Sequence, residues 1–315
     1  ELAAVNMGLT IKEAIDRVRG LTRNVETIHN IFVVDNENRL VGILPLDKFI
    51  LAGPDEMVAN IMDKAEICAT TNIDQEEVAN IFKKYNLVTL PVVDEARRLM
   101  GRITIDDVVD VIEEEASEDI MRMAGMDAEE LIYESKALKA SKLRVPWLLT
   151  NLLGGLATGY LLWLFKVTLK DVLALVTFIP VITGMGGNVG IQSSSLMVRG
   201  LATGHVDLLN LKKILLKEFK VGVILGTICG SGAGITALLW HKNPMIGIVV
   251  GVSMITAMTV AASMGTLIPA FFKLIKVDPA IASGPFVTTA NDITGILIYL
   301  GTATLFLKFF YNFHA

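Results

Sequence analysis

The sequence predicts an α+β multidomain membrane protein, in which a mixed front half is followed by an all-helical membrane half. Two observations lead to this prediction. Hydrophobic residues make up 52% of the 315 residues, more than most soluble proteins contain. The charged residues are also unevenly spread, because residues 1–142 are ordinarily charged whereas residues 145–310 are apolar stretches with short polar joints. We therefore expect the main boundary to lie between these parts.

The composition excludes several classes of function. The net charge of −5 originates in the front half, and no basic stripe with interleaved aromatic residues is present, so we expect no nucleic acid partner. Cys68 and Cys229 lie in different halves, which argues against a disulfide framework. The sequence shows no Ser/His/Asp, Cys/His or P-loop arrangement, so an enzyme is disfavoured.

The front half contains an internal repeat. Residues 30–44 form the pattern of a strand, a polar turn and a second strand, and residues 87–104 repeat this pattern. Each first strand ends in an aspartate and each second strand contains Leu-x-Gly. Helical patterns precede both hairpins, at residues 11–19 and 75–85, and Asp74 is the expected N-cap of the second helix.

The two copies resemble a tandem pair of CBS domains. The second copy, residues 87–107, carries the resemblance best, with Thr-Leu-Pro-Val-Val-Asp followed by Gly-Arg-Ile-Thr-Ile-Asp-Asp. In that family the threonine and the aspartate three residues later hold an adenine nucleotide, so the resemblance implies that Thr104 and Asp107 bind a nucleotide such as ATP. Pro45 and Lys48 occupy the matching positions of the first copy. A purely structural β-α pair is the alternative.

An acidic run follows the second copy. Residues 106–119 contain eight carboxylates in fourteen residues, on a segment with good helical propensity. Asp107, Asp110 and Glu114 share one helix face, where like charges repel unless cations screen them. One interpretation is a solvated acidic face. The other is a low-affinity cation sensor, because hard divalent ions prefer clustered carboxylate oxygens.

Five apolar segments in the second half are long enough to cross a bilayer core of about 30 Å. Their expected bounds are 145–165, 172–199, 214–240, 244–272 and 281–311. Basic residues concentrate in the joints before the first span, between the second and third, and between the fourth and fifth. The positive-inside rule then predicts a cytoplasmic front half and a C-terminus outside, in the inner or plasma membrane.

The second span contains a glycine-rich and hydroxyl-rich stretch at residues 180–195. We expect a break there that frees backbone carbonyls, which is tolerated where protein or a water-filled cavity satisfies them. Close packing of small residues between helices is the alternative, and it explains Asn188 and Gln192 less easily.

The fifth span contains Asp292, which we expect to be the one ionisable group deep in a span. A charge at the bilayer centre costs at least ~2.5 kcal/mol, so such a residue is a functional candidate that faces a bundle interior or an aqueous path. The alternative is a protonated structural aspartate that forms a hydrogen bond with Thr288 or Gln192.

The whole chain resembles the MgtE family of magnesium channels and transporters. The motifs that carry the resemblance are Thr-Gly-Met-Gly-Gly-Asn-Val-Gly-Ile-Gln at residues 183–192, Asp-Pro-Ala at 278–280 and Thr-Thr-Ala-Asn-Asp-Ile-Thr-Gly at 288–295. The resemblance implies a homodimer whose central pore is lined by the second and fifth spans of each protomer. The family also carries an N-terminal helical domain that this sequence does not match, so we expect the sequence to begin inside a longer one.

The resemblance also divides the chain into four parts. It implies a first CBS domain at residues 1–53, a second at 54–113, a linking plug helix at 114–144 and a transmembrane domain at 145–315. The expected function is Mg²⁺-selective uptake that cytosolic Mg²⁺ closes. A CBS-regulated secondary transporter of another divalent cation or substrate is the alternative.

The site residues follow from the same resemblance. The pore ion site is assigned to Asp292, with Thr288 and Asn188 nearby. The expected sensor consists of acids in the CBS pair, the plug helix and the joint before the fifth span, which are Glu76, Asp107, Asp110, Glu115, Glu118, Asp119 and Asp278. Mg²⁺ would bridge these carboxylates and hold the plug closed, and like-charge repulsion would separate them when Mg²⁺ falls.

Overall fold

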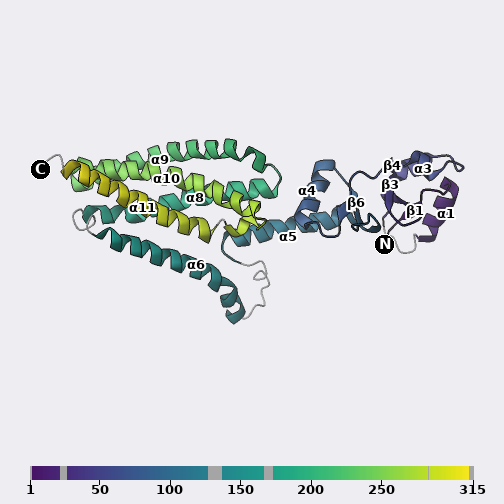
Figure 1. Ribbon diagram of the computed structural model, residues 1–315, viewed down its shortest axis with the longest axis horizontal. Helices are drawn as coiled ribbons and strands as arrows, with labels where there is room; N and C mark the ends of the chain where they lie inside the picture. Colours follow the sequence, from purple (N-terminus) through teal and green to yellow (C-terminus); the bar gives the residue numbers. More distant parts are fainter. Residues whose placement is uncertain (1, 22–26, 127–136, 167–172, 283, 312–315) are drawn as a thin grey trace. The chain divides into compact units, whose positions relative to one another are not determined.

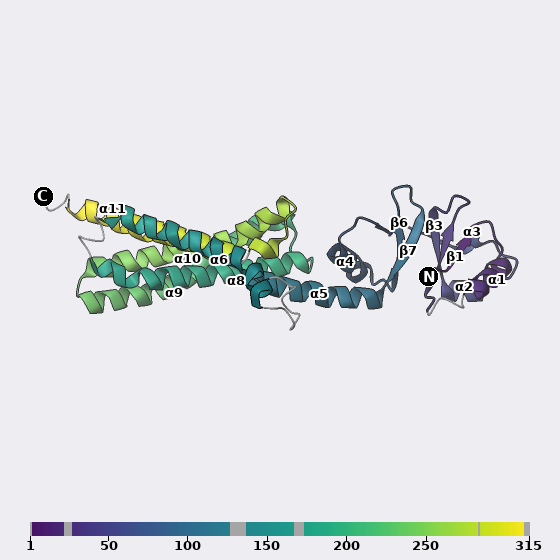
Figure 2. The same cartoon turned by 90° about the horizontal axis from the view of Figure 1, so that it is seen from below.

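The computed structural model describes residues 2–21, 27–126, 137–166, 173–282 and 284–311. The chain forms two compact units, Glu1–Ala116 and Ser117–Ala315, whose elements are drawn in Figures 1 and 2. The middle of the predicted linker, residues 127–136, lies outside the described residues.

The first copy of the repeat is a four-stranded sheet in the order β1-β2-β3-β4. Strand β1 runs parallel to β2, and the β2–β3 and β3–β4 pairs are antiparallel. The apolar residues of α1 and of the strands form one core, which includes Ile11, Ile31 and Leu44. The elements of this copy are β1 (Ala4–Asn6), α1 (Ile11–Leu21), β2 (Asn30–Val34), β3 (Leu40–Pro45), α2 (Leu46–Leu51), α3 (Val58–Ile61) and β4 (Asp63–Lys64).

The second copy repeats this arrangement as a three-stranded sheet in the order β5-β6-β7, with β5 parallel to β6 and β6 antiparallel to β7. The predicted N-cap is present, because the Asp74 side chain accepts a hydrogen bond from the Glu76 backbone N–H at 2.9 Å. The elements of this copy are β5 (Ala69–Thr70), α4 (Gln75–Tyr85), β6 (Thr89–Val93), β7 (Leu99–Thr104) and α5 (Ile105–Met123). The two β-α units predicted from the repeat are therefore confirmed.

The turns of the two β-hairpins join the copies. Asp94 closes its turn by accepting a hydrogen bond from the Arg98 backbone N–H at 2.8 Å, and this bond holds the pKa of Asp94 below its usual value. Across the copies, the Leu40 N–H donates to the Arg97 carbonyl and the Leu99 N–H donates to the Asn38 carbonyl, both at 2.9 Å. The repeat thus pairs with itself through backbone bonds as well as through a shared apolar core.

The second unit contains five helices long and apolar enough to cross a membrane, counted among the described residues. They are α6 (Ala137–Leu164), α8 (Ile179–Ala202), α9 (Leu211–His241), α10 (Pro244–Leu274) and α11 (Pro285–Tyr311), with the short 3-10 turns η2 (Leu173–Phe178), η3 (Leu208–Asn210) and η4 (Pro279–Ala282). The five-helix membrane domain is confirmed, although α6 begins at Ala137 and not near residue 145. Long basic side chains can reach toward water from the end of such a helix, so the apolar span is shorter than the helix.

Helix α10 packs most extensively against α9 and also contacts α8 and α11. Glycines allow α9 and α10 to approach closely: a Cβ at Gly226 would lie 2.9 Å from the Ile255 Cα, and a Cβ at Gly234 would lie 2.8 Å from the Gly247 carbonyl oxygen. These clashes show that the glycines are required by packing, as is usual where membrane helices meet.

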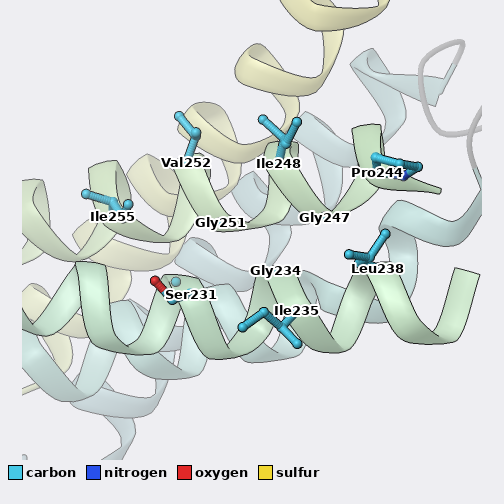
Figure 3. A pocket seen from close by; sticks show the side chains of 11 residues that line it. Ser231, Gly234, Ile235, Leu238, Pro244, Gly247, Ile248, Gly251, Val252 and Ile255 are labelled. Atoms are coloured by element: carbon cyan, nitrogen blue, oxygen red, sulfur yellow. The ribbon is translucent and has the colours of Figure 1, made fainter. Parts of the chain in front are cut away.

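Gly230 and Gly234 of α9 and Gly247 and Gly251 of α10 line a shallow groove of about 460 Å³. Figure 3 shows Ile235 and Leu238 of α9 and Ile248, Val252 and Ile255 of α10 around it. Ser231 is the sole residue of the lining with a polar side chain. The described residues of the lining are thus almost wholly apolar, as expected where membrane helices pack through glycine.

The expected break in the second span is wrong, because α8 continues as an α-helix from Ile179 to Ala202 through the whole glycine-rich stretch. Intrahelical hydrogen bonds satisfy the backbone in an apolar environment, and this gain outweighs the cost of about 1 kcal/mol for each helical glycine. The glycine-rich stretch is therefore part of a continuous α-helix.

Candidate ion pathway and sensor

Asp292 lies on α11 and is half-buried in this chain. Within the described residues it has no hydrogen-bond or ion-pair partner, and Thr288, one turn before it, donates its hydroxyl to the Gly284 carbonyl at 3.1 Å instead. The hydrogen bonds to Thr288 or Gln192 that a structural aspartate would need are therefore not formed.

Asn188 and Gln192 are exposed on α8, one turn apart and on the same face of the helix. The opposite face is packed, since Ile182, Val189 and Met197 are buried. An amide on the outside of a membrane helix is costly in lipid, so such a face meets protein or water.

Helices α8 and α11 cross at the glycine-rich stretch. A Cβ at Gly187 would lie 3.9 Å from the Thr288 methyl carbon, so the residue before Asn188 is next to Thr288. A Cβ at Gly190 would lie 1.7 Å from the Asn291 amide nitrogen, which shows that the Asn291 side chain occupies the space a side chain at 190 would need. The structure therefore brings the predicted residues Asn188 and Thr288 into the same region.

Asn291 is itself unusual, because it is 1% exposed and neither its amide nitrogen nor its amide oxygen has a hydrogen-bond partner in the part of the chain that the structure describes. It faces α8 at Gly190, whereas Asp292 is the next residue along α11. A buried amide without a partner costs about 1–3 kcal/mol, so this contact is maintained by the packing around it.

Sequence reasoning missed a second acid in the membrane helices, Glu218 of α9. Glu218 is 6% exposed, and its carboxylate accepts a hydrogen bond from the hydroxyl of Ser193 on α8 at 2.8 Å. The Lys217 Nζ lies 3.8 Å from the same carboxylate, but the Lys217 side chain is 72% exposed. The lysines on either side of Glu218 suggest that it belongs to a polar helix end. The signal that could have revealed it as a buried acid is its position seven residues after the start of α9.

The proposed sensor acids at the end of α5 are joined by an arginine. Arg122 forms ion pairs with Glu118, one turn earlier, and with Asp278 in the joint between α10 and α11. The Arg122 side chain is 32% exposed and both carboxylates are 29% exposed, so all three are substantially shielded from water. Asp278 also accepts a hydrogen bond from the Ala280 N–H at 2.8 Å, which orients its carboxylate.

Backbone packing holds the same two segments together. A Cβ at Gly284 would lie 2.2 Å from the Met123 carbonyl oxygen, so the start of α11 approaches the end of α5 as closely as glycine allows. Gly125 has a φ of +72°, a conformation that favours glycine, and it lies against Pro285. The end of α5 therefore docks at the entrance of the helix that carries Asp292.

The remaining sensor candidates lie in the first unit or next to Glu118. Gln75, at the start of α4, donates a hydrogen bond to Glu115 at 2.6 Å, which places Glu115 beside the turn that contains Glu76. Asp107 and Asp110 are exposed, and Asp119 is half-buried. Among the residues that the structure describes, no three His, Cys, Asp or Glu side chains converge to hold a metal ion.

Thr104 and Asp107 do come together. The Thr104 hydroxyl donates to the Asp107 carboxylate at 2.6 Å and the Thr104 N–H donates to the same oxygen at 3.0 Å, which caps α5. At the matching place in the first copy, Lys48 pairs with Asp63 at 2.7 Å.

Comparison with known proteins identifies the chain. Residues 179–302 match the family model described as MgtE, divalent cation transporter, and residues 1–54 and 58–114 match the CBS domain. The chain is 40% identical over 309 residues to the magnesium transporter MgtE of Thermus thermophilus, and the match covers 98% of the chain and 68% of that protein. The chain belongs to the MgtE family of magnesium transporters. The family resemblance inferred from the sequence is confirmed, and MgtE proteins are transporters, not enzymes.

Other MgtE relatives agree. The magnesium transporter MgtE of Enterococcus faecalis is 36% identical over 310 residues, covering 98% of the chain and 68% of that protein. Among solved structures, the cytosolic domain of the Mg²⁺ channel MgtE in complex with ATP is 44% identical over 35% of the chain and 44% of that structure, with a TM-score of 0.34. The soluble part of a magnesium transporter is 34% identical over 37% of the chain and 45% of that structure, with a TM-score of 0.36.

Replacing Gly190 by alanine in this MgtE chain should lower stability and magnesium uptake together. The new Cβ would collide with the Asn291 amide and lie 3.1 Å from a Val287 methyl carbon, and overpacking of this kind typically costs about 1–3 kcal/mol. The thermal unfolding midpoint in detergent and the uptake rate in proteoliposomes measure the effect. Gly186→Ala is the matched control, because a Cβ there meets no atom within 4 Å. Equal behaviour of the two variants would show that α8 and α11 do not meet at Gly190.

Proposed function

We propose that this protein is a Mg²⁺-selective channel that mediates magnesium uptake. The observation that carries the proposal is Asp292, a half-buried carboxyl without a partner among the described residues, on a helix that crosses the Asn188 region of α8. Mg²⁺ keeps most of its water ligands and is well served by one or two carboxylates. A single acid beside a polar helix face suits a hydrated ion.

The same observations favour a homodimer with the pathway on its two-fold axis. The exposed amides of Asn188 and Gln192 need a polar environment, and the same face of a second protomer provides one. Two copies of Asp292 across the axis would neutralise the double charge of the ion. Self-complementary contact of this kind is the usual form of a two-fold interface.

The charges at the helix ends support the proposed orientation in the inner or plasma membrane. Lys212 and Lys213 stand at the start of α9, and Lys273 and Lys276 stand at the end of α10. The opposite joint, between α9 and α10, holds only His241 and Lys242. With the positive ends in the cytosol, the CBS pair is cytoplasmic and the C-terminus is outside.

Gating by cytosolic Mg²⁺ is proposed from the docking of the α5 end. Glu118 and Asp278 meet through Arg122, and Glu115 lies at the start of α4 near Glu76. Mg²⁺ bound by these acids, together with Asp107, Asp110 and Asp119, would favour the docked form. The ion changes the equilibrium only if it binds the closed form more tightly than the open form.

The test of the transport function is ion flux in proteoliposomes that contain the purified chain. Mg²⁺ should enter down an imposed membrane potential without a counter-ion gradient, and Co²⁺, Mn²⁺ and Ni²⁺ should compete with different strengths. Uptake that requires a gradient of another ion would favour a secondary transporter instead, and uptake of none of the divalent ions would reject the proposal.

We also propose that the CBS pair binds an adenine nucleotide at Thr104 and Asp107. Thr104→Val should weaken ATP binding to the full chain about tenfold or more, because it removes a hydroxyl that orients Asp107. A tenfold change in affinity corresponds to about 1.4 kcal/mol. Titration calorimetry measures the affinity.

The control for this prediction is Thr10→Val. The Thr10 hydroxyl and N–H both donate to Glu13 at 2.9 Å, so this variant removes an equivalent helix cap in the first copy. If both variants bind ATP as the unchanged chain does, the Thr104–Asp107 pair is structural only.

A further inference from the structure

Glu218 is a buried acid of the second unit that the proposed transport does not use. It is an acid inside an apolar helix, seven residues after the start of α9, or about 10 Å along the helix axis. Ionisable residues inside membrane helices are rare and are functional candidates with a nameable partner. The partner here is Ser193 of α8.

The contact between the two side chains is directional. The Ser193 hydroxyl donates to the Glu218 carboxylate at 2.8 Å, and the two residues are 4% and 6% exposed. Because both groups are buried, a donor or acceptor left without its partner would cost about 1–3 kcal/mol. The hydroxyls of Ser263 and Thr259, by contrast, donate to carbonyls of their own helix and so join no second helix.

The position of Ser193 gives this bond its consequence. Ser193 follows Gln192 directly on α8, and successive side chains of an α-helix are about 100° apart. When Ser193 points at α9, Gln192 and Asn188 therefore point to the open face of the bundle, where both are exposed. A helix with side chains has a radius of about 5–6 Å, so a rotation of ten degrees moves such a side chain by about 1 Å.

The other contacts of α8 restrict how closely this helix approaches its neighbours more than they restrict its rotation about its own axis. Gly190 meets Asn291 of α11, and a Cβ at Gly265 of α10 would lie 2.3 Å from the Gly190 carbonyl oxygen and 3.1 Å from the Ser193 Cβ. Dispersion contacts of this kind are individually weak and not directional. The Ser193–Glu218 hydrogen bond is directional and can therefore fix the rotation of α8 about its axis.

We infer that Glu218 is a positioning residue for the ion pathway: through Ser193 it fixes the rotation of α8 and hence the direction of Asn188 and Gln192. The inference rests on the proposed function, because it takes the exposed face of α8 to line the pathway. Glu218 acts at a distance from the ion and needs its acceptor oxygen rather than its charge.

The test compares variants that separate the acceptor from the charge. Glu218→Met removes the acceptor and keeps a similar length, whereas Glu218→Gln keeps an acceptor oxygen without the charge. In proteoliposomes, Glu218→Met and Ser193→Ala should each reduce Mg²⁺ uptake about tenfold and change the ratio of Mg²⁺ to Co²⁺ uptake. The uptake rate of Glu218→Gln should stay within about threefold of the unchanged chain. The size of the effect is expected because a displacement of about 1 Å can lower a rate by as much as a hundredfold. The double variant should be no worse than the more affected single variant.

Ser193→Ala deletes one hydroxyl and keeps the measurement possible if Glu218→Met does not fold. Its matched control is Ser263→Ala, which removes a hydroxyl that bonds only within α10 and should not alter uptake. Normal uptake and ion ratio in folded Ser193→Ala would overturn the inference. Equal loss in Glu218→Gln and Glu218→Met would do the same, because it would assign the effect to the charge.

A second measurement reads the orientation of α8 without ion transport. In a background that lacks Cys68 and Cys229, Gln192→Cys is labelled with a water-soluble thiol reagent, with and without Ser193→Ala. The labelling rate should change several-fold, whereas Lys242→Cys in the α9–α10 joint should label at the same rate in both. Failure of the unchanged chain to take up Mg²⁺ would reject the proposed function alone, and an unchanged labelling rate at residue 192 would reject this inference alone.

Discussion

Asp292→Asn is expected to abolish Mg²⁺ uptake while the protein remains folded. The substitution preserves the shape of the side chain and removes the negative charge, which is half-buried and has no partner among the described residues. Opposite unit charges 4 Å apart attract by about 4 kcal/mol at an effective dielectric constant near 20. Loss of an attraction of this size corresponds to much more than a tenfold decrease in ion occupancy, since about 1.4 kcal/mol suffices for a factor of ten.

The measurement is Mg²⁺-dependent growth of an uptake-deficient cell, combined with flux in proteoliposomes. Asp207→Asn is a suitable control, because Asp207 accepts a hydrogen bond from the Leu209 N–H at 3.0 Å in the joint between α8 and α9, outside the pathway. Asparagine is also a close mimic of a protonated aspartate. Intact uptake by Asp292→Asn would therefore mean that Asp292 is a neutral structural group and would reject the pore assignment.

Arg122→Gln is expected to increase the ratio of Mg²⁺-free to Mg²⁺-saturated current. In the structure the Arg122 guanidinium already lies with Glu118 and Asp278, where the sensor hypothesis would place a metal ion. Without Arg122, the two carboxylates repel when no Mg²⁺ is present, so the docked form is weakened, whereas Mg²⁺ meets no competing cation. A partly exposed ion pair contributes about 1 kcal/mol or less, which limits the change for one pair to about fivefold.

Currents from inside-out patches, with Mg²⁺ varied on the cytosolic face, measure this ratio. Arg122→Lys keeps the charge and should stay close to the unchanged chain, and Glu118→Gln combined with Asp119→Asn should reduce the inhibition by Mg²⁺. An unchanged ratio in Arg122→Gln and unchanged inhibition in the double variant would together restore the interpretation of the acidic run as a solvated helix face.

Much of the architecture followed from local patterns. The repeat that ends in Asp35 and Asp94 predicted two β-α units because hairpins are specified by short-range alternation and turn residues. The five spans followed from apolar length alone. The resemblance to CBS domains singled out Thr104 and Asp107, and the start of α5 brings the two side chains together.

Contacts between distant residues were not predictable in the same way. The glycine-rich stretch of α8 was expected to break, but a sequence cannot distinguish a glycine that frees the backbone from one that admits a neighbour such as Asn291. The acids Glu118 and Asp278 were expected to meet through Mg²⁺, and nothing in the run itself indicated that Arg122 would lie between them. Glu218 was not predicted as a buried acid, because its hydrogen bond joins it to Ser193, 25 residues away in the sequence.

The sequence by itself determined the class of this protein: a CBS pair and five membrane helices of the MgtE family, with one costly aspartate, Asp292, in the last helix. The repeat and the helices depend on periodicity and apolar length, which are local properties of the chain, and the CBS and MgtE families were inferred from the resemblance of short motifs. The tertiary structure decided which polar groups are paired and which are left available. The packing of helices brings Ser193 to Glu218 and Arg122 to Asp278, and it leaves Asp292 without a partner among the described residues. That packing depends on residues far apart in the sequence.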